Sequence, residues 1–368
     1  MIKAIDKWLW PYLRSVLGRP RIVDGPVHVM VALCDHYEPL SPRAGQPTDV
    51  GDARVARWLE QWPKLVGDFR GADGCPPKTT LFYPAEEAEQ PGRYVPRLLP
   101  LVRNGLAEIE IHLHHRNDTA GNLRSTLIEF RDWLHGEHGL LGTDRSGTPR
   151  YCFIHGNWAL CNSHPSGDWC GVDDEIDVLL ETGCVADMTF PSLPSPTQPR
   201  HFCNDLYRCR QRGGKPRSHD HGRRARVGNT PAADELLMVQ GPVGLNWAWR
   251  KLGVIPRIEH ADLCASNPPT PARADLWIRQ HIHVRGRPEW VFVKLHTHGC
   301  LETNADVLLG EPMRRLFRHL GEISGECCVH FVSARELYNI VRAAEDGKKG
   351  NPSEYREYEL ARPAARTD

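Results

Sequence analysis

Three histidines stand within four positions where the sequence reads EIEIHLHHRND, at residues 108–118. They are His112, His114 and His115, and they end a run that alternates like a β-strand. Because side chains alternate across a strand, Glu110, His112 and His114 would share one face, opposite a face of isoleucine and leucine. Neighbouring imidazoles can chelate one divalent ion, and zinc accepts both histidine nitrogen and carboxylate oxygen. The cluster therefore predicts a metal site with zinc as the expected ion.

A second group of polar residues follows the apolar run VHVMVALCD at residues 27–35. This run predicts a buried strand, and it ends in Asp35, His36 and then Glu38. A buried isolated charge costs several kcal/mol, so a carboxylate at this place needs a partner, and a metal ion would supply one. The alternative is a turn in which Asp35 caps the backbone.

A late strand, residues 290–299, ends in KLHTHG, so His296 and His298 would lie on one face before Gly299 permits a sharp exit. Three strand ends that each deliver histidine or aspartate favour a common site over chance placement. The apolar run in RYCFIHGNWAL is followed by three further candidates, which are His155, Asn157 and Trp158. An indole there could stack on a sugar ring, and the alternative for it is a place in the core.

The elements that carry these residues alternate between strand and helix. Strands are predicted at 27–35, 78–86, 106–115, 150–160, 184–192, 290–299 and 328–334, and helices at 53–69, 93–105, 123–139, 173–183, 312–323 and 335–347. Such alternation implies parallel strands with right-handed crossovers. At least seven strand–helix steps favour an α/β barrel over two domains, and the active site of such a barrel lies at the carboxyl ends of its strands.

We expect three parts: an N-terminal helical segment at 1–24, the barrel at 25–347 and a polar, frayed tail at 348–368. Within the barrel we expect a basic insertion near residues 200–240, because residues 200–226 hold nine Arg and Lys but only two Asp. Such a segment is either a solvated excursion or a wall that holds an anionic substrate.

Charge and hydropathy limit the function classes. Lys and Arg number 46 and so do Asp and Glu, a balance that argues against a dedicated nucleic-acid binder. No apolar run reaches the roughly 18 residues of a membrane span, and the first residues lack the apolar core of a secretory signal, so we expect the cytoplasm. The N-terminal helix either docks on the barrel or makes peripheral membrane contact through Trp8 and Trp10.

Taken in order, these motifs resemble the polysaccharide deacetylase superfamily (NodB homology, carbohydrate esterase family 4). The likeness covers the layout of about residues 27–345, and four short motifs carry it: Asp35, the strand–helix–strand segment that ends in the histidine cluster, FIHGNW and VKLHTHG. The resemblance implies a distorted (β/α)7-type barrel. The family usually has two adjacent aspartates where this chain has Cys34–Asp35 or Asp35–His36, and it spaces its two histidines four apart, whereas here they are two or three apart.

The resemblance implies hydrolysis of an acetyl group on a sugar or polysaccharide, with one divalent ion that activates water and polarises the acyl oxygen. The expected ligands are Asp35, His112 and His114, with His36 or His115 as substitutes. The base would be Asp35 or Glu38, and His296, assisted by His298, would protonate the leaving group.

Contact with the carbohydrate would come from His155, Asn157 and Trp158. Two other readings stay open: a metal-dependent hydrolase of a glycosidic or amide bond, and a non-catalytic carbohydrate-binding or assembly protein.

Overall fold

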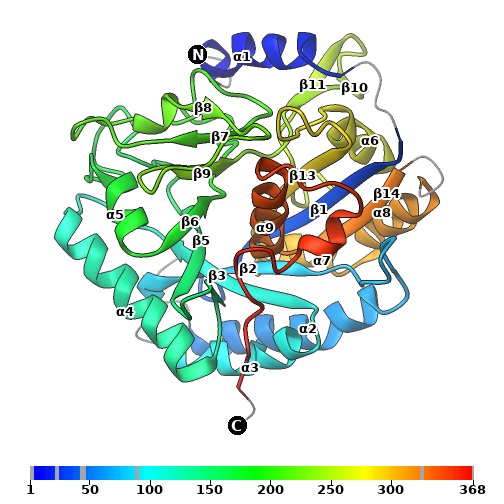
Figure 1. The fold of residues 1–368 in the computed structure, drawn as a ribbon. Helices are drawn as coiled ribbons and strands as arrows, with labels where there is room; N and C mark the ends of the chain where they lie inside the picture. The colour runs from blue at the N-terminus through cyan, green and yellow to red at the C-terminus, as the bar shows by residue number, and fades with distance from the viewer. Residues whose placement is uncertain (1–3, 21–24, 42–46, 88–90, 324–326, 367–368) are drawn as a thin grey trace.

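The computed structural model describes residues 4–20, 25–41, 47–87, 91–323 and 327–366, and parts of the predicted N-terminal segment and tail lie outside them. The chain is a mixed α/β structure built on one mostly parallel sheet (Figure 1). Its parallel strands, in spatial order, are β13 (Trp290–Thr297), β1 (Val27–His36), β2 (Thr79–Pro84), β3 (Ala107–Leu113), β5 (Pro149–His155), β6 (Cys184–Asp187) and β9 (Leu236–Val239).

Short strands extend this sheet. They are β12 (Asp262–Leu263) beside β13, the antiparallel β7 (Leu206–Cys209) and β8 (Arg223–Arg224) beyond β9, β14 (Cys327–Val332) on the first half of β1, and β4 (Gly142–Thr143) on β5. A separate hairpin consists of β10 (Gly244–Lys251) and β11 (Ile255–Glu259).

The register brings the carboxyl ends of the parallel strands to one edge. Cys34 of β1 pairs with His296 of β13, and His112 of β3 pairs with Ile154 of β5. The polar residues that end these strands therefore meet, as the sequence predicted. This common edge is where open α/β sheets and barrels place their binding sites.

Among the described residues, strand pairing does not close the sheet into the expected seven-stranded barrel: β12 lies at one end and β8 at the other. The sheet is nevertheless strongly curved. Lys294 of β13 donates from Nζ to the carbonyl oxygen of Met188, just after β6, at 2.7 Å. Five neighbouring-strand steps separate β13 from β6, so only a curled sheet can bring these two groups together.

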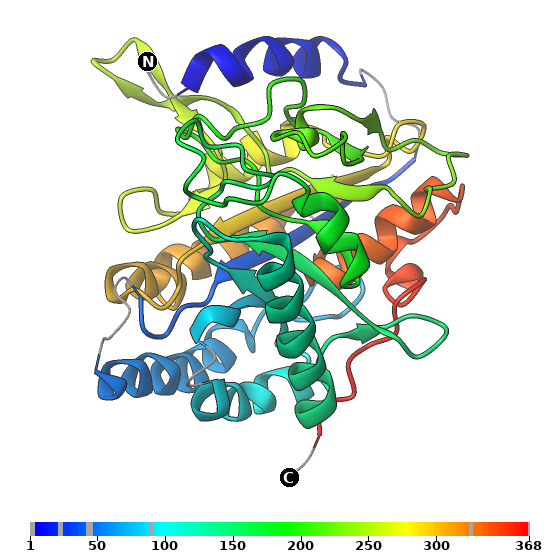
Figure 2. The same cartoon turned by 90° about the vertical axis from the view of Figure 1, so that its left-hand side faces the viewer.

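Helices follow most of the parallel strands (Figure 2). They are α1 (Ile5–Leu17), α2 (Thr48–Val66), α3 (Pro91–Arg103), α4 (Ala120–His138), α5 (Glu175–Glu181), α6 (Pro271–Arg279), α7 (Glu302–Leu308), α8 (Glu311–Glu322) and α9 (Ala334–Glu345), with short 3₁₀ turns η2 (Ala85–Glu87), η3 (Ser218–Asp220) and η5 (Pro352–Tyr355). Most agree with the predicted ranges to within a few residues.

The two faces of β1 contact different parts of the core. Val29, Val31 and Leu33 belong to an apolar cluster that includes Trp58 and Trp62 of α2. The alternate side chains, Met30, Ala32 and Cys34, belong to a second cluster that includes α9 and the inner faces of β5 and β13. Because side chains alternate, this division decides which polar residue at the end of β1 points into the curved sheet.

The basic segment near residues 200–240, which we expected as an insertion, is part of the central sheet. It forms the antiparallel edge of the sheet through β7 and β8, and then supplies β9. Several of its arginines pair with carboxylates: Arg208 with Glu345, Arg223 with Glu235 and Arg224 with Asp205. Its positive charge is therefore largely neutralised within the protein and does not form a wall for an anionic substrate.

The tail from residue 348 also differs from the frayed segment that we expected. Leu360 is buried, and Ala361 donates from its backbone N–H to the carbonyl of Thr143. Arg335 of α9 donates from Nη1 to the carbonyl oxygens of Arg356 and Leu360. As far as residue 366, this segment is packed against α9 and β4.

Candidate metal centre

Four histidines and one carboxylate gather at the carboxyl edge of β1, β3 and β13. Nε2 of His112 lies 3.0 Å from Oε1 of Glu38, and Nε2 of His114 lies 3.6 Å from the same oxygen. The ring of His36 lies 4.8 Å from that of His112 and 4.5 Å from that of His298. His36, Glu38 and His112 each offer a ligand atom, all within 4.8 Å of one another, so this cluster could hold a metal ion.

Strand geometry explains how these groups converge. His36 is the last residue of β1, and its side chain shares the inward face of Cys34. The backbone continues along β2 for one more residue, with the N–H of Tyr37 donating to the carbonyl of Phe82. The side chain of Glu38 then points toward His112. His112 is the second-last residue of β3, two strands away in a parallel sheet.

The hydrogen-bond geometry of His112 suits a cation at this place. Nδ1 lies 3.0 Å from the carbonyl oxygen of Ile154, which can only accept, so Nδ1 carries a hydrogen. The other ring nitrogen, Nε2, faces the carboxylate of Glu38, which is also an acceptor. A proton or a metal ion must lie between them. A histidine ligand commonly donates its other N–H to a carbonyl or carboxylate in this way.

His114 repeats the arrangement. Its Nδ1 contacts the carboxylate of Glu86, which leaves Nε2 directed toward Glu38. If protons alone explained both contacts, two imidazolium rings would lie side by side, with ring centres 4.6 Å apart. A single divalent ion explains both, and ligand atoms about 2.1 Å from a tetrahedral ion lie about 3.4 Å apart, close to the 3.0 and 3.6 Å observed.

The charges at the cluster also suit a metal. Burial lowers the pKa of His36 well below its usual value, and the neighbouring His298 and His112 lower it further, so His36 is neutral as a ligand must be. Burial alone would raise the pKa of Glu38, but the hydrogen bond to His112 and the charges of the surrounding histidines outweigh it and lower the pKa to about 2. Glu38 is therefore an ionised carboxylate.

Asp35, our first choice of ligand, does not join this cluster. Alternation along β1 turns its side chain to the opposite face from His36, where Oδ1 accepts from the backbone N–H of Gly299 at 2.6 Å. A Cβ on Gly299 would lie 2.1 Å from Oδ2 of Asp35, so only glycine fits there. The indole N–H of Trp58 also holds this glycine by donating to its carbonyl oxygen. His36 and Glu38 occupy the place in the cluster that we had assigned to Asp35.

Replacing Asp35 by asparagine is expected to change how stability depends on pH. Burial raises the pKa of Asp35 from 3.8 to about 7. Below pH 4 this carboxyl group is protonated in both the folded and the unfolded protein. Between pH 4 and 7 it is ionised in the unfolded chain but still protonated in the folded one, so rising pH destabilises the wild-type fold. Asparagine cannot ionise, so the variant avoids up to about 4 kcal/mol of this loss in the free energy of unfolding.

Urea unfolding of the chelator-treated proteins at pH 4, 6 and 8 measures this effect. We expect Asp35→Asn to gain stability over the wild type as the pH rises. An equal difference between the two proteins at all three pH values would contradict the buried neutral carboxyl.

His296 and His298 lie beside the metal cluster on β13. His296 is buried, 6.4 Å from His36 between ring centres, and its Nε2 is 4.0 Å from Oδ1 of Asp262. His298 is partly buried next to His36. Burial lowers the pKa of both rings, so both are neutral near pH 7. The structure thus brings His296, His298 and Glu38 together, whereas Asp35 lies on the opposite face of β1.

A second buried cluster contains His115, His155, Cys170 and Glu175, whose ligand atoms also lie within 4.8 Å of one another. His115, which we expected as a substitute ligand at the first cluster, belongs here. His155, which we expected to contact substrate, is fully buried here. Glu175 was not among our candidates, because DDEIDVLLETG reads as an acidic first turn of a solvated helix.

Hydrogen bonds hold most of this second cluster together, although Nε2 of His155 has no hydrogen-bond partner among the described residues. Oε2 of Glu175 accepts from the backbone N–H of Cys161 and from Sγ of Cys170, while Oε1 lies 3.2 Å from Nε2 of His115. His115 also faces Asp118, and although burial opposes it, the two carboxylates raise the pKa of His115 to about 9. His155 accepts at Nδ1 from Asn157, so its Nε2 carries a hydrogen and points at Glu175.

Part of the loop at residues 155–158, which was predicted to contact a sugar, has a structural role. The side-chain amide of Asn157 donates to the carbonyls of His115 and Trp169. Trp158 is partly buried, with its backbone in the left-handed region at φ 57°. The side chain of Asn157 is thus occupied by backbone contacts, whereas that of Trp158 is partly buried.

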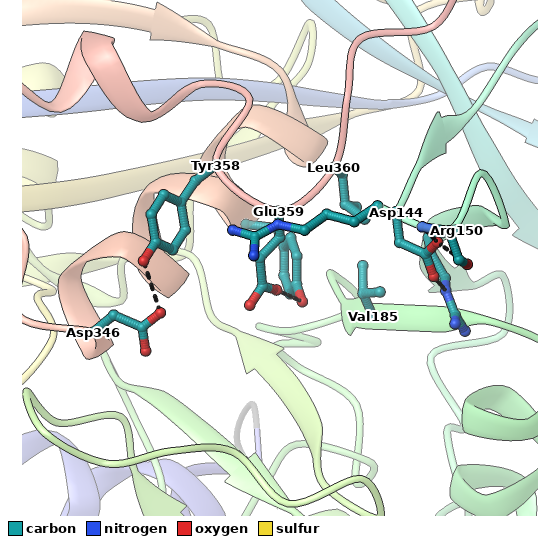
Figure 3. Close-up of a pocket in the computed structure, with 10 residues that line it drawn as sticks. Asp144, Arg150, Val185, Asp346, Tyr358, Glu359 and Leu360 are labelled. Carbon is teal, nitrogen blue, oxygen red and sulfur yellow. Dashed lines mark hydrogen bonds and ion pairs between the residues drawn. The ribbon is translucent and has the colours of Figure 1, made fainter.

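A separate pocket of about 650 Å³ lies between α9, the C-terminal segment and β5 (Figure 3). Its polar groups are already bonded to one another, with Tyr358 donating to Asp346 and Arg150 to Asp144. Arg150 is the second residue of β5 and Val185 the second of β6, so the pocket lies at the amino ends of the strands. It shares no lining residue with the metal cluster, which lies at the carboxyl ends.

The chain matches no protein-family profile and none of the curated proteins. The site must therefore be interpreted from its own geometry.

Proposed function

We propose that the protein is a metal-dependent hydrolase whose ion is held by His36, Glu38 and His112, with His114 as a fourth ligand. The observation that carries this proposal is the orientation of His112: its Nδ1 donates to the carbonyl oxygen of Ile154, and its Nε2 faces Oε1 of Glu38 at 3.0 Å. The histidine and carboxylate donors suit zinc best.

When bound, the ion would lower the pKa of a water molecule and polarise the acyl oxygen. The chain's own residues handle the protons. His298 is neutral and adjoins His36, so it accepts the proton of the attacking water. His298 would then return this proton to the leaving amine or alcohol, while His296, whose ring lies 6.4 Å from that of His36, would help to position the site. Asp35 is too enclosed against Gly299 to act as the base.

The proposed substrate is an acetylated sugar or polysaccharide, with Trp158 as the stacking platform. This part rests on the resemblance to polysaccharide deacetylases and on a curved parallel sheet of the kind that a distorted (β/α)7 barrel would contain. Trp158 follows the carboxyl end of β5 by three residues, and a half-buried indole suits a sugar, which has one apolar face.

Acetate release from acetylated oligosaccharides by zinc-loaded protein tests this function. We expect Glu38→Gln, which keeps the shape but removes the charge, to lower kcat/KM by at least about 100-fold, an effect of about 2.7 kcal/mol or more on the barrier. Glu86→Gln, which alters only the partner of His114, should lose less. Activity of Glu38→Gln equal to the wild type, or absence of acetate with every substrate, would exclude the proposal.

A further inference from the structure

Exposed large apolar side chains are concentrated on two elements far apart in the sequence. Five lie on α1 and five on the β10–β11 hairpin, and we call these ten residues the docking face: Ile5, Leu9, Trp10, Leu13, Leu17, Trp247, Trp249, Leu252, Val254 and Ile255. Exposure reaches 64% for Trp10 and 90% for Leu252. Clustered apolar exposure of this kind marks an interaction surface.

The two elements lie together at one end of the molecule. Both views place α1 and the hairpin at the top of the drawing (Figures 1 and 2). The inner side of α1, through Trp8 and Tyr12, packs in one cluster with Val243, and Leu245 and Ile258 of the hairpin base pack against it. Trp8, one of the two tryptophans named for the alternative of membrane contact, is thus buried at 1% exposure, and the opposite side of α1 carries its part of the docking face.

Basic side chains accompany the exposed tryptophans. The guanidinium of Arg257 lies 3.9 Å from the ring centre of Trp249, that of Arg14 lies 5.4 Å from Trp10 and that of Arg250 lies 5.8 Å from Trp247. Lys251 adds another charge. The one acidic residue of the hairpin, Glu259, is buried and paired with Arg273, so the exposed part of the hairpin is cationic.

The hairpin projects from the body of the protein and does not form a groove. Figure 2 shows it extending beyond the body at the same end of the molecule as α1. Leu252 occupies its turn at φ 52°, followed by Gly253 at φ 73°. Turns of this kind ordinarily carry Asn, Asp or Gly, so an exposed leucine there costs conformational energy and gains nothing within the protein.

We infer that the docking face binds the surface of a lipid bilayer that contains anionic headgroups. Tryptophan and arginine side chains suit the boundary between headgroups and acyl chains, where the ring is partly apolar and the guanidinium reaches phosphate. Among the described residues, no helix is both long and apolar enough to cross a membrane, so α1 would lie in the plane of the interface. This inference does not depend on the proposed hydrolase activity.

Co-sedimentation of the full chain with phosphatidylcholine vesicles, with and without phosphatidylglycerol, tests the inference. We expect binding that requires phosphatidylglycerol. Leu252→Ser with Trp247→Ser should weaken the partition roughly tenfold or more, because each buried side chain contributes on the order of 1.5–3 kcal/mol. Trp169→Ser, which changes an exposed tryptophan outside the docking face, should bind as the wild type does.

The charge contribution has its own variants. Arg250→Gln with Lys251→Gln should reduce binding about fivefold per charge removed. Lys64→Gln with Arg315→Gln, which removes two exposed charges on α2 and α8, should have no comparable effect.

Failure of the wild type to bind anionic vesicles would overturn the inference, and so would equal binding to neutral ones. A lipid-free oligomer that Leu252→Ser disperses would instead identify a second copy of the chain as the occupant of the docking face.

Discussion

His112→Ala is expected to abolish stoichiometric zinc binding while the protein stays folded. The substitution removes the nitrogen that faces Glu38 at 3.0 Å and leaves three of the four proposed donors, His36, Glu38 and the partly exposed His114. Loss of a hydrogen-bond partner of a ligand already costs roughly 10–100-fold in affinity, so loss of the ligand itself should cost more. Dialysis against zinc followed by elemental analysis gives the stoichiometry.

The matched control is His221→Ala, because His221 is exposed and lies outside both clusters. It should bind one ion per chain, as the wild type should. Equal zinc content in His112→Ala and the wild type would show that the ion, if there is one, lies elsewhere.

Glu175→Ala is expected to destabilise the fold by about 3–5 kcal/mol, the cost of removing one partner from a buried charge pair. The substitution would leave the imidazolium of His115 with Asp118 alone, and the backbone N–H of Cys161 without an acceptor. Glu181→Ala on the same helix removes an exposed pair with Arg124, and it should cost less than about 1 kcal/mol. Urea unfolding compares the two variants.

The same variant separates the two clusters as metal sites. If the ion is bound at Glu38, folded Glu175→Ala should retain one zinc per chain. Loss of zinc in Glu175→Ala together with retention in His112→Ala would assign the metal to the second cluster.

Much of the fold could be predicted from periodicity, because its long strands and helices carry strong patterns. The strand at residues 27–35 became β1 and the helix at 123–139 became α4, each shifted by at most a few residues. The strands from β7 to β12 were missed. Several of them contain only two to four residues, which is too short for an alternation of apolar and polar side chains to be recognised.

The histidine cluster could be predicted, but its ligands only in part. The choice between Asp35 and His36 depends on which face of β1 points inward, and β1 is apolar on both faces, so its sequence carries no signal of orientation. His115 follows the end of β3, where alternation no longer applies, and it turns away to Glu175. That partner lies 60 residues further along the chain.

Anomalous X-ray scattering from crystals grown with zinc tests the central claim most directly. A peak at the zinc edge within bonding distance of His36, Glu38 and His112 is the predicted result. A peak bound by His115, His155, Cys170 and Glu175, or no peak at either cluster, would contradict it.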